Sequence, residues 1–276
     1  MSVTDIATKK PVGASSTQQL ALELAATTRL LEAEGILDYS GHVSARIPGR
    51  DDAFLIQIGS TSRQEVGPEH ILVCDFDCKV IEGEGQPPSE TVIHSEIFKA
   101  RPDVNAVLHC HMDLAIAFTM MEGVKIELMR ARASRWKSGV PTHPDPSHIK
   151  LKEQGVALAK TLGPHHVALM RAHGLVMTAE SIGHLFVDAV HFKENAFAQL
   201  QVMQSGAKVV PLTDAEIEEI EAMEMRDWHL KKLWNYYVRK ALKDGVLPSD
   251  WTALIPSKDA MKRDKMYDER RVVKKS

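Results

Sequence analysis

Two histidines separated by one residue, His109 and His111, are the clearest sign of chemistry in this chain of 276 residues. His109 ends the apolar run 105–109 (NAVLH), which predicts a short β-strand. Because a strand directs alternate side chains to the same face, both imidazoles should point together. Neutral imidazole is a common ligand for zinc and related ions. A structural pair at a strand end has the same spacing, so the pair alone leaves both interpretations open.

Two residues outside this pair, His173 and Glu90, favour the metal interpretation. His173 lies near the end of the run 166–174 (HVALMRAHG), which predicts a second strand followed by a helix, and the ends of adjacent strands are where α/β sheets build their sites. Glu90 lies near the start of a predicted helix at 89–101, where the helix dipole favours a carboxylate. A first-turn or capping glutamate occupies the same place. We predict that three imidazoles hold one divalent ion, with Glu90 as a ligand or proton-transfer group.

The elements that position these side chains alternate between strand and helix. Apolar residues at helical spacing predict helices at 17–35, 89–101, 112–121, 150–163, 181–203 and 214–244, and Ser89 is placed to cap the second of these. Alternating apolar residues predict strands at 42–47 and 53–59, and further strands within 71–85 around a turn at 75–79. The pattern predicts an α/β sheet with helices on both faces and with antiparallel pairing in its first part.

Composition divides the chain into three parts. Residues 1–16 are rich in Lys, Pro, Gly, Ser and Thr and are expected to form a flexible tail. Residues 17–210 are expected to form one α/β domain. Residues 211–276 are expected to form a helical extension and a basic tail that could wrap a neighbouring subunit.

Charge and cysteine content exclude several classes of protein. The net charge of -3 comes from 34 basic and 37 acidic residues, too balanced for general nucleic-acid binding. Three cysteines do not form a disulfide framework and indicate a reducing compartment. No stretch has the roughly 20 apolar residues of a membrane span or the apolar core of a secretory signal. We expect a cytoplasmic protein that binds neither nucleic acid nor membrane.

The chain contains the segments SGHVSAR, PPSE, LHCH and RAHGLVM in this order. Together they resemble the class II aldolase/adducin superfamily over residues 18–205. The metal-ligand positions of that superfamily are filled here by Glu90, His109, His111 and His173. The resemblance implies a three-layer α/β/α fold with a central mixed, largely antiparallel sheet, and a homo-oligomer, a tetramer with active sites between subunits. It also implies one divalent metal ion per subunit, Mn²⁺ or Zn²⁺, that stabilises an enolate-like intermediate.

Two motifs depart from those of superfamily members that act on sugar phosphates. Residues 41–44 read Gly-His-Val-Ser where those members have Gly-Asn-x-Ser, and residues 88–90 read Pro-Ser-Glu in place of Ser-Ser-Glu. An amide and a hydroxyl that would face a phosphate are lost, so a phosphorylated sugar is disfavoured. The resemblance leaves Ser44 and Ser89 as candidate substrate contacts and His42 as a candidate catalytic residue.

An arginine cluster and a tyrosine complete the candidate substrate contacts. Arginine binds carboxylates through paired hydrogen bonds, so Arg132 or Arg135 could hold a carboxylate of the substrate. Tyr237, in the last predicted helix, is a candidate contact for an aromatic ring. A surface or subunit-interface role is the commoner explanation for the arginines, and helix packing is the commoner one for Tyr237.

These features favour the superfamily branch that decarboxylates hydroxylated aromatic or pyridine dicarboxylates. The substrate would be a small-molecule carboxylate that chelates the ion through a ring hydroxyl and the adjacent carboxylate group. After carbon dioxide leaves, Glu90 or His42 would protonate the ring carbon. Two alternatives stay open. One is class II retro-aldol cleavage of an unphosphorylated hydroxy-oxo acid, and the other is an adducin-like interaction module without catalysis.

Overall fold

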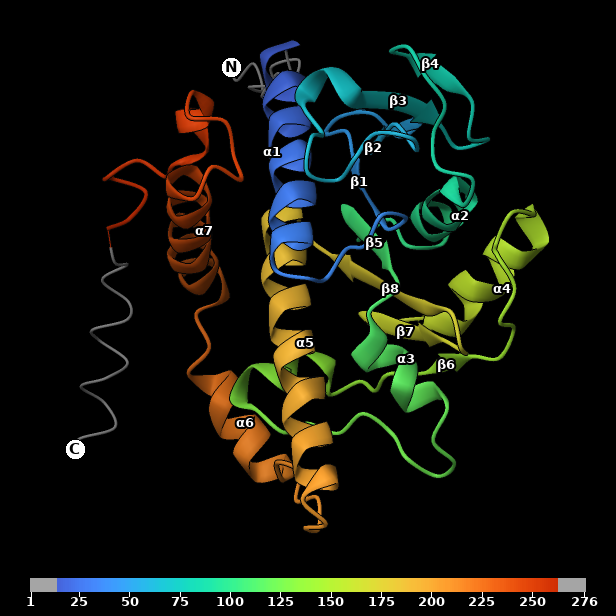
Figure 1. The fold of residues 1–276 in the computed structure, drawn as a ribbon, viewed down its shortest axis with the longest axis vertical. Coiled ribbons are helices and arrows are strands. Elements are labelled where there is room, and N and C mark those ends of the chain that lie inside the picture. Colours follow the sequence, from blue (N-terminus) through green and yellow to red (C-terminus); the bar gives the residue numbers. More distant parts are fainter. Residues whose placement is uncertain (1–13, 263–276) are drawn as a thin grey trace, which may run out of the picture.

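The computed structural model describes residues 14–262, which are organised around one central sheet (Figure 1). The eight strands follow the order β4-β3-β2-β1-β5-β8-β7-β6. Their bounds are β1 His42–Arg46, β2 Ala53–Gln57, β3 Ile71–Asp75, β4 Val80–Glu82, β5 Ala106–Cys110, β6 Thr142–His143, β7 Val167–Met170 and β8 Gly174–Ala179. Only β6 and β7 pair in parallel, and all other neighbours are antiparallel. The prediction of a mixed, largely antiparallel sheet is confirmed.

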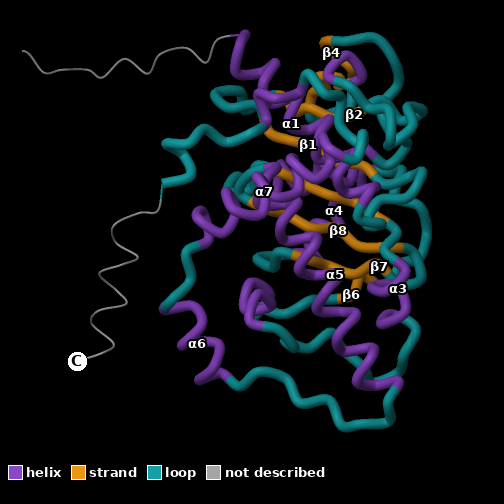
Figure 2. The backbone as a smooth tube through the Cα atoms, turned by 60° about the vertical axis from the view of Figure 1, so that its left-hand side comes forward, coloured by secondary structure: helices purple, strands orange, loops and turns teal. Residues whose placement is uncertain are grey.

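Helices cover both faces of the sheet. They are α1 Ala14–Ala33, α2 Thr91–Ala100, α3 Asp113–Thr119, α4 Lys152–Leu162, α5 Ile182–Gln204, α6 Asp214–Ala222 and α7 Arg226–Lys243. In Figure 1, α1 and α5 lie along one face, α2 and α4 lie on the other, and α7 lies outside α1 and α5. Figure 2 shows the strands one above another, with β4 and β6 at opposite ends of the sheet. The predicted three-layer α/β/α fold is therefore confirmed.

The strand period of two builds a separate apolar core on each face. In β5, Leu108 and Cys110 are buried in the core beneath α1 and α5, whereas Val107 is buried in the core beneath α2 and α4. By the same alternation, His109 faces the α2 side. It is paired with His42 of the neighbouring β1, so both imidazoles leave the sheet on that side.

The single helix predicted at 214–244 is wrong, because the structure has two helices there. The α6 helix ends at Ala222 and α7 begins at Arg226, with non-helical backbone at Met225 between them. The break allows Glu224 to pair with Arg132 while α7 packs against α5. The segment contains neither glycine nor proline, so no local signal marks the break.

The prediction around His173 is also corrected. Residues 166–174 were expected to form one strand that leads into a helix, but β7 ends at Met170 and β8 begins at Gly174. His173 therefore lies in a turn between two antiparallel strands. Glycine at position 174 is required there, because a Cβ atom would overlap the Cys110 carbonyl of β5. The close approach of the backbones brings His173 beside the end of β5.

Two predicted helix boundaries differ from the observed ones. Ser89 does not cap α2, whose N-cap residue is Glu90 without a side-chain capping bond. The α1 helix begins at Ala14, before the predicted start at residue 17. The remainder of the predicted N-terminal tail and most of the basic C-terminal tail lie outside the described residues, so the three-part division stays a prediction. Within residues 14–262, no helix combines the length and the apolar character needed to span a membrane.

Candidate metal centre

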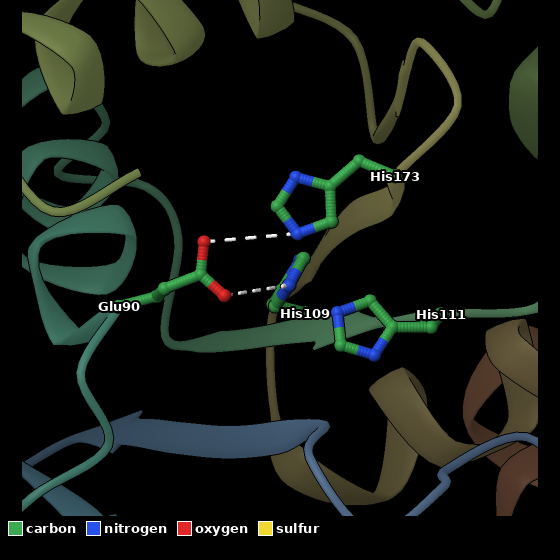
Figure 3. Close-up of side chains that lie close together, drawn as sticks. All are labelled: Glu90, His109, His111 and His173. Carbon is green, nitrogen blue, oxygen red and sulfur yellow. Dashed lines mark ion pairs between the residues drawn. The ribbon is translucent and has the colours of Figure 1, made fainter. Parts of the chain in front are cut away.

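Four side chains converge at the end of β5: Glu90, His109, His111 and His173 (Figure 3). One ligand atom from each lies within 4.8 Å of those of the other three. Glu90 comes from the start of α2, the His109 and His111 pair from the end of β5, and His173 from the turn before β8. The structure thus brings together all four residues that the sequence singled out as metal ligands.

The three imidazoles are oriented by hydrogen bonds at their outer nitrogens. Each Nδ1 atom donates to an oxygen, which is the Leu175 carbonyl for His109 (3.0 Å), the Asp38 carboxylate for His111 (2.9 Å) and the Ser147 carbonyl for His173 (3.2 Å). Because each acceptor is an oxygen without a hydrogen to give, the ring proton lies on Nδ1. The lone pair of each ring is then on Nε2, which is the arrangement usual for metal-bound histidine.

The three Nε2 atoms are buried and have no hydrogen-bond partner among the described residues. Buried polar atoms are almost always paired, and leaving one unpaired costs about 1–3 kcal/mol. Three such atoms that face one point are therefore the strongest evidence for a cation site. Three imidazole nitrogens with one carboxylate oxygen suit Zn²⁺, and they also suit other divalent transition ions.

The carboxylate of Glu90 completes the cluster. One of its oxygens accepts the Ile149 N–H (2.7 Å), and its two oxygens lie 3.6 Å from Nε2 of His109 and 3.7 Å from Nε2 of His173. Burial would raise the pKa of Glu90, but its pKa lies well below its ordinary value, and with lone pairs on both facing Nε2 atoms the Ile149 N–H is the donor that stabilises the charged carboxylate. Glu90 is therefore a carboxylate at neutral pH and can neutralise part of the charge of an ion.

Asp38 supports the site and was not anticipated from the sequence. Besides its bond to His111, it accepts the backbone N–H groups of Ser40 (2.9 Å) and Gly41 (2.8 Å). Burial would raise the pKa of Asp38, but these hydrogen bonds outweigh burial and lower it. The loop before β1 and the end of β5 are thereby tied together by one carboxylate.

A cavity of about 540 Å³ opens beside the four residues. His42, Ser89, Glu90 and His111 line it, together with Arg63, His148 and Lys150, which were not among the predicted contacts. Glu90 is the single carboxylate among the described residues that line this cavity. The surroundings are therefore positively charged and favour an anionic ligand.

Arg63 is a buried cation at the wall of this cavity. Its side chain donates to the carbonyls of Ser40, Gly41, Gly59 and Thr61, at distances of 2.6 to 3.2 Å. All of these acceptors are backbone carbonyls, and the nearby carboxylate of Asp38 is hydrogen-bonded to Ser40, Gly41 and His111. Burial lowers the pKa of Arg63 from 12.5, but arginine stays charged at neutral pH. Its charge is thus available to an anion in the cavity.

Three predicted contacts lie away from the four residues within this subunit. Arg132 pairs with Glu224, while Arg135 pairs with Glu180 and Asp188, and both line a different cavity of about 330 Å³ beside α5 and α6. Tyr237 packs on Phe186 of α5, with ring centroids 5.0 Å apart. All three belong to the side of the sheet that α1 and α5 cover, opposite the candidate metal centre.

The two predicted serine contacts differ in position. Ser89 is exposed and lines the cavity, so it can reach a ligand there. Ser44 is fully buried, and its hydroxyl is bound to His94 of α2. His94 was not among the predicted site residues, because nothing in its spacing on the helix sets it apart from a packing residue.

Comparisons with known proteins identify the family of this chain. The family described as the class II aldolase and adducin N-terminal domain matches residues 22–200. The 3,4-dihydroxyphthalate decarboxylase of Arthrobacter keyseri is 26% identical over 211 residues, which cover 71% of this chain and 84% of that protein.

Solved structures share the fold. An aldolase II superfamily protein from Pseudomonas syringae has a TM-score of 0.73 at 24% identity, and the match covers 85% of this chain and 96% of that one. An L-fuculose 1-phosphate aldolase from Glaciozyma antarctica has a TM-score of 0.72 at 19% identity, and covers 86% of this chain and 95% of that one. At these identities the likeness concerns the fold.

Proposed function

Because this chain belongs to the class II aldolase and adducin family, we propose that it is a divalent-metal-dependent decarboxylase of a hydroxylated aromatic or heteroaromatic dicarboxylate. The observation that carries the proposal is the set of three buried, unpartnered Nε2 atoms beside the Glu90 carboxylate. A module used only for protein interaction gains nothing from keeping these lone pairs unpaired. The geometry therefore favours an enzyme over an adducin-like module.

The walls of the cavity support a dianionic substrate. A dicarboxylate that turns one carboxylate toward the four proposed ligands can turn the other toward Arg63 and Lys150, which line the same cavity. This assignment replaces Arg132 and Arg135, which are already paired with carboxylates on the other side of the sheet. Similarity to a 3,4-dihydroxyphthalate decarboxylase over 71% of this chain supports the same substrate class.

The proposed roles follow from position. Glu90, His109, His111 and His173 would hold the ion. When bound, the ion would supply Lewis-acid polarisation of substrate oxygens, which lowers the energy of charge that develops there. Ser89, exposed at the cavity, would donate a hydrogen bond to the substrate.

Decarboxylation breaks one bond between a ring carbon and a carboxylate, leaves the electron pair on the ring carbon, and then requires one proton. Glu90 and His42 are the donors proposed from the sequence. The structure adds His148, whose Nδ1 lies 3.7 Å from the Glu90 carboxylate and whose side chain is 72% exposed. Exposure allows this imidazole to exchange protons with solvent between turnovers.

Product analysis tests the proposal. The purified chain, supplied with Mn²⁺ or Zn²⁺, should release one carbon dioxide for each 3,4-dihydroxyphthalate consumed, and His109→Ala should abolish both metal binding and turnover. Aldehyde and pyruvate-like fragments from an unphosphorylated hydroxy-oxo acid would instead identify the retro-aldol reaction. A chain that binds no ion and turns over neither substrate would support the adducin-like module.

The tetramer with sites between subunits stays part of the proposal. Within one subunit Arg132 and Tyr237 are far from the candidate ligands, so either could contribute only to a neighbour's site. If Arg132 serves a neighbour's site, Arg132→Ala is inactive on its own and regains activity in oligomers mixed with His109→Ala subunits. If Arg132→Ala alone is fully active, Arg132 has no role in catalysis.

A further inference from the structure

A buried row of three hydrogen-bonding side chains lies behind the cavity. The Ser44 hydroxyl oxygen is 2.5 Å from Nδ1 of His94, and Nε2 of His94 is 2.6 Å from Nδ1 of His42. Ser44 and His94 have no exposed surface, and His42 is 2% exposed. His42 and Ser44 alternate along β1 and so share its α2 face, onto which α2 places His94.

Both imidazoles in this row are neutral, because both are buried and neither has a carboxylate partner among the described residues. Nδ1 of His42 and Nε2 of His94 are 2.6 Å apart, so one of these two nitrogens carries the hydrogen and the other offers a lone pair. Each ring therefore carries one N–H and one lone pair, and each link in the row holds one hydrogen.

The hydrogens could point in either of two directions along the row. If His42 donates to His94 and His94 donates to Ser44, the Ser44 hydroxyl hydrogen has no acceptor, since this oxygen has no other hydrogen-bond partner among the described residues. If Ser44 donates to His94 and His94 donates to His42, every buried hydrogen in the row has an acceptor. The second direction avoids the roughly 1–3 kcal/mol that an unpaired buried donor costs.

We propose that Ser44 and His94 fix His42 in the tautomer that carries its proton on Nε2. Since Nδ1 of His42 is taken by His94, Nε2 is the nitrogen left for the cavity that this ring lines. His42 is thus a neutral N–H donor that binds an oxygen of the substrate. Ser44 and His94 are positioning residues that act through it, and the hydroxyl of Ser44 is not a substrate contact.

This tautomer removes His42 from the proton-transfer step. Its Nε2 atom has no lone pair with which to accept a proton, and the N–H of a neutral imidazole is a very weak acid. The proton for the ring carbon then comes from the Glu90 and His148 side of the cavity. The substrate part of this inference rests on the proposed function, whereas the tautomer itself depends only on the three side chains.

Neutron diffraction from crystals of the deuterated, zinc-supplied protein tests the tautomer directly. We expect deuterium on Nε2 of His42 and on Nε2 of His94, with the Ser44 deuterium directed at His94. Deuterium on Nδ1 of His42 would overturn the proposal. This readout holds whether or not the protein decarboxylates 3,4-dihydroxyphthalate, so it separates a failure of the tautomer from a failure of the proposed function.

Two variants at one position test the functional consequence. His94→Phe keeps the ring volume but removes the donor to His42, so kcat/KM should fall by about 10–100-fold while zinc affinity stays unchanged. His94→Gln supplies an amide N–H to the same acceptor and should recover most of the loss. Equal losses in both variants, with zinc affinity and thermal stability intact, would contradict the positioning role, as would full activity in His94→Phe.

Discussion

Replacing Asp38 with asparagine tests how the candidate metal centre is held in place. The Asp38 carboxylate accepts the Nδ1 hydrogen of His111 at 2.9 Å and the N–H groups of Ser40 and Gly41 through its other oxygen. An asparagine amide has only one oxygen. If that oxygen stays with the two backbone groups, the amide N–H₂ faces the N–H of His111, and if it turns to His111, the backbone N–H groups face a donor.

The magnitude follows from the kind of bond that is lost. Carboxylate partners of metal-bound histidines typically contribute 10–100-fold to metal affinity, or about 1.4–2.7 kcal/mol. The Asp38 side chain is 32% exposed and that of His111 is 20% exposed, so solvent screens the pair only in part. We therefore expect zinc affinity to fall by about 30-fold in Asp38→Asn.

Competition with a chromogenic chelator measures this change. Asp52→Asn is the matched control, because Asp52 pairs with Arg50 at the surface and its substitution removes the same charge away from the cavity. Asp52→Asn should bind zinc as the parent protein does. A zinc affinity of Asp38→Asn within twofold of the parent would refute the idea that Asp38 holds His111 for metal binding.

Three further predictions concern substrate binding and stability. Lys150→Met should raise KM for a dicarboxylate about fivefold, or about 1 kcal/mol for an exposed charge pair, and should leave KM for the monocarboxylate analogue unchanged. Lys152→Met is the control, because Lys152 does not line the cavity. Equal effects of Lys150→Met on both substrates would contradict the assignment of Lys150 to the second carboxylate. Ala172 has a φ of 55°, so Ala172→Gly should raise the free energy of unfolding by about 1 kcal/mol in urea titrations, and a decrease would show that this backbone is unstrained. Burial would raise the pKa of Glu180, but the hydrogen bond from Arg226 lowers this pKa to about 2. The ionised Glu180 therefore stabilises the fold above its ordinary pKa of 4.5, and this stabilisation is lost as the pH falls from 4.5 toward 2. Glu180→Gln should therefore lower the free energy of unfolding by about 1–2 kcal/mol at pH 7, after allowance for solvent screening, and by less at pH 4; a gap that widens in acid would have the wrong sign.

Sequence periodicity predicted the parts of the site that depend on local structure. The alternation of a strand is sufficient to place His109 and His111 on one side, and a histidine before Gly174 lies beside them because only glycine allows the backbone to approach Cys110 so closely. The sheet and its two helical layers follow from the same periodicities. The strand and helix periodicities depend on residues close together in the chain, whereas the approach of Gly174 to Cys110 joins distant segments and was found only in the structure.

The supporting residues could not be predicted in the same way. Asp38 meets His111 across 73 positions of sequence, and His94 meets His42 across 52, so neither pairing leaves a local pattern. Arg132 was one of two candidate substrate contacts because arginine suits carboxylates, and the carboxylate it binds is Glu224 of its own chain. Residue type predicted the chemistry of that contact, but only the packing of the helices determined its partner.

Anomalous diffraction at the zinc edge, from crystals grown with Zn²⁺, tests the central claim most directly. We expect one anomalous peak that lies about 2.0–2.2 Å from Nε2 of each of the three histidines and from a carboxylate oxygen of Glu90. A protein that contains zinc but shows no peak among these four residues, or whose only peak lies against other side chains, would contradict the account.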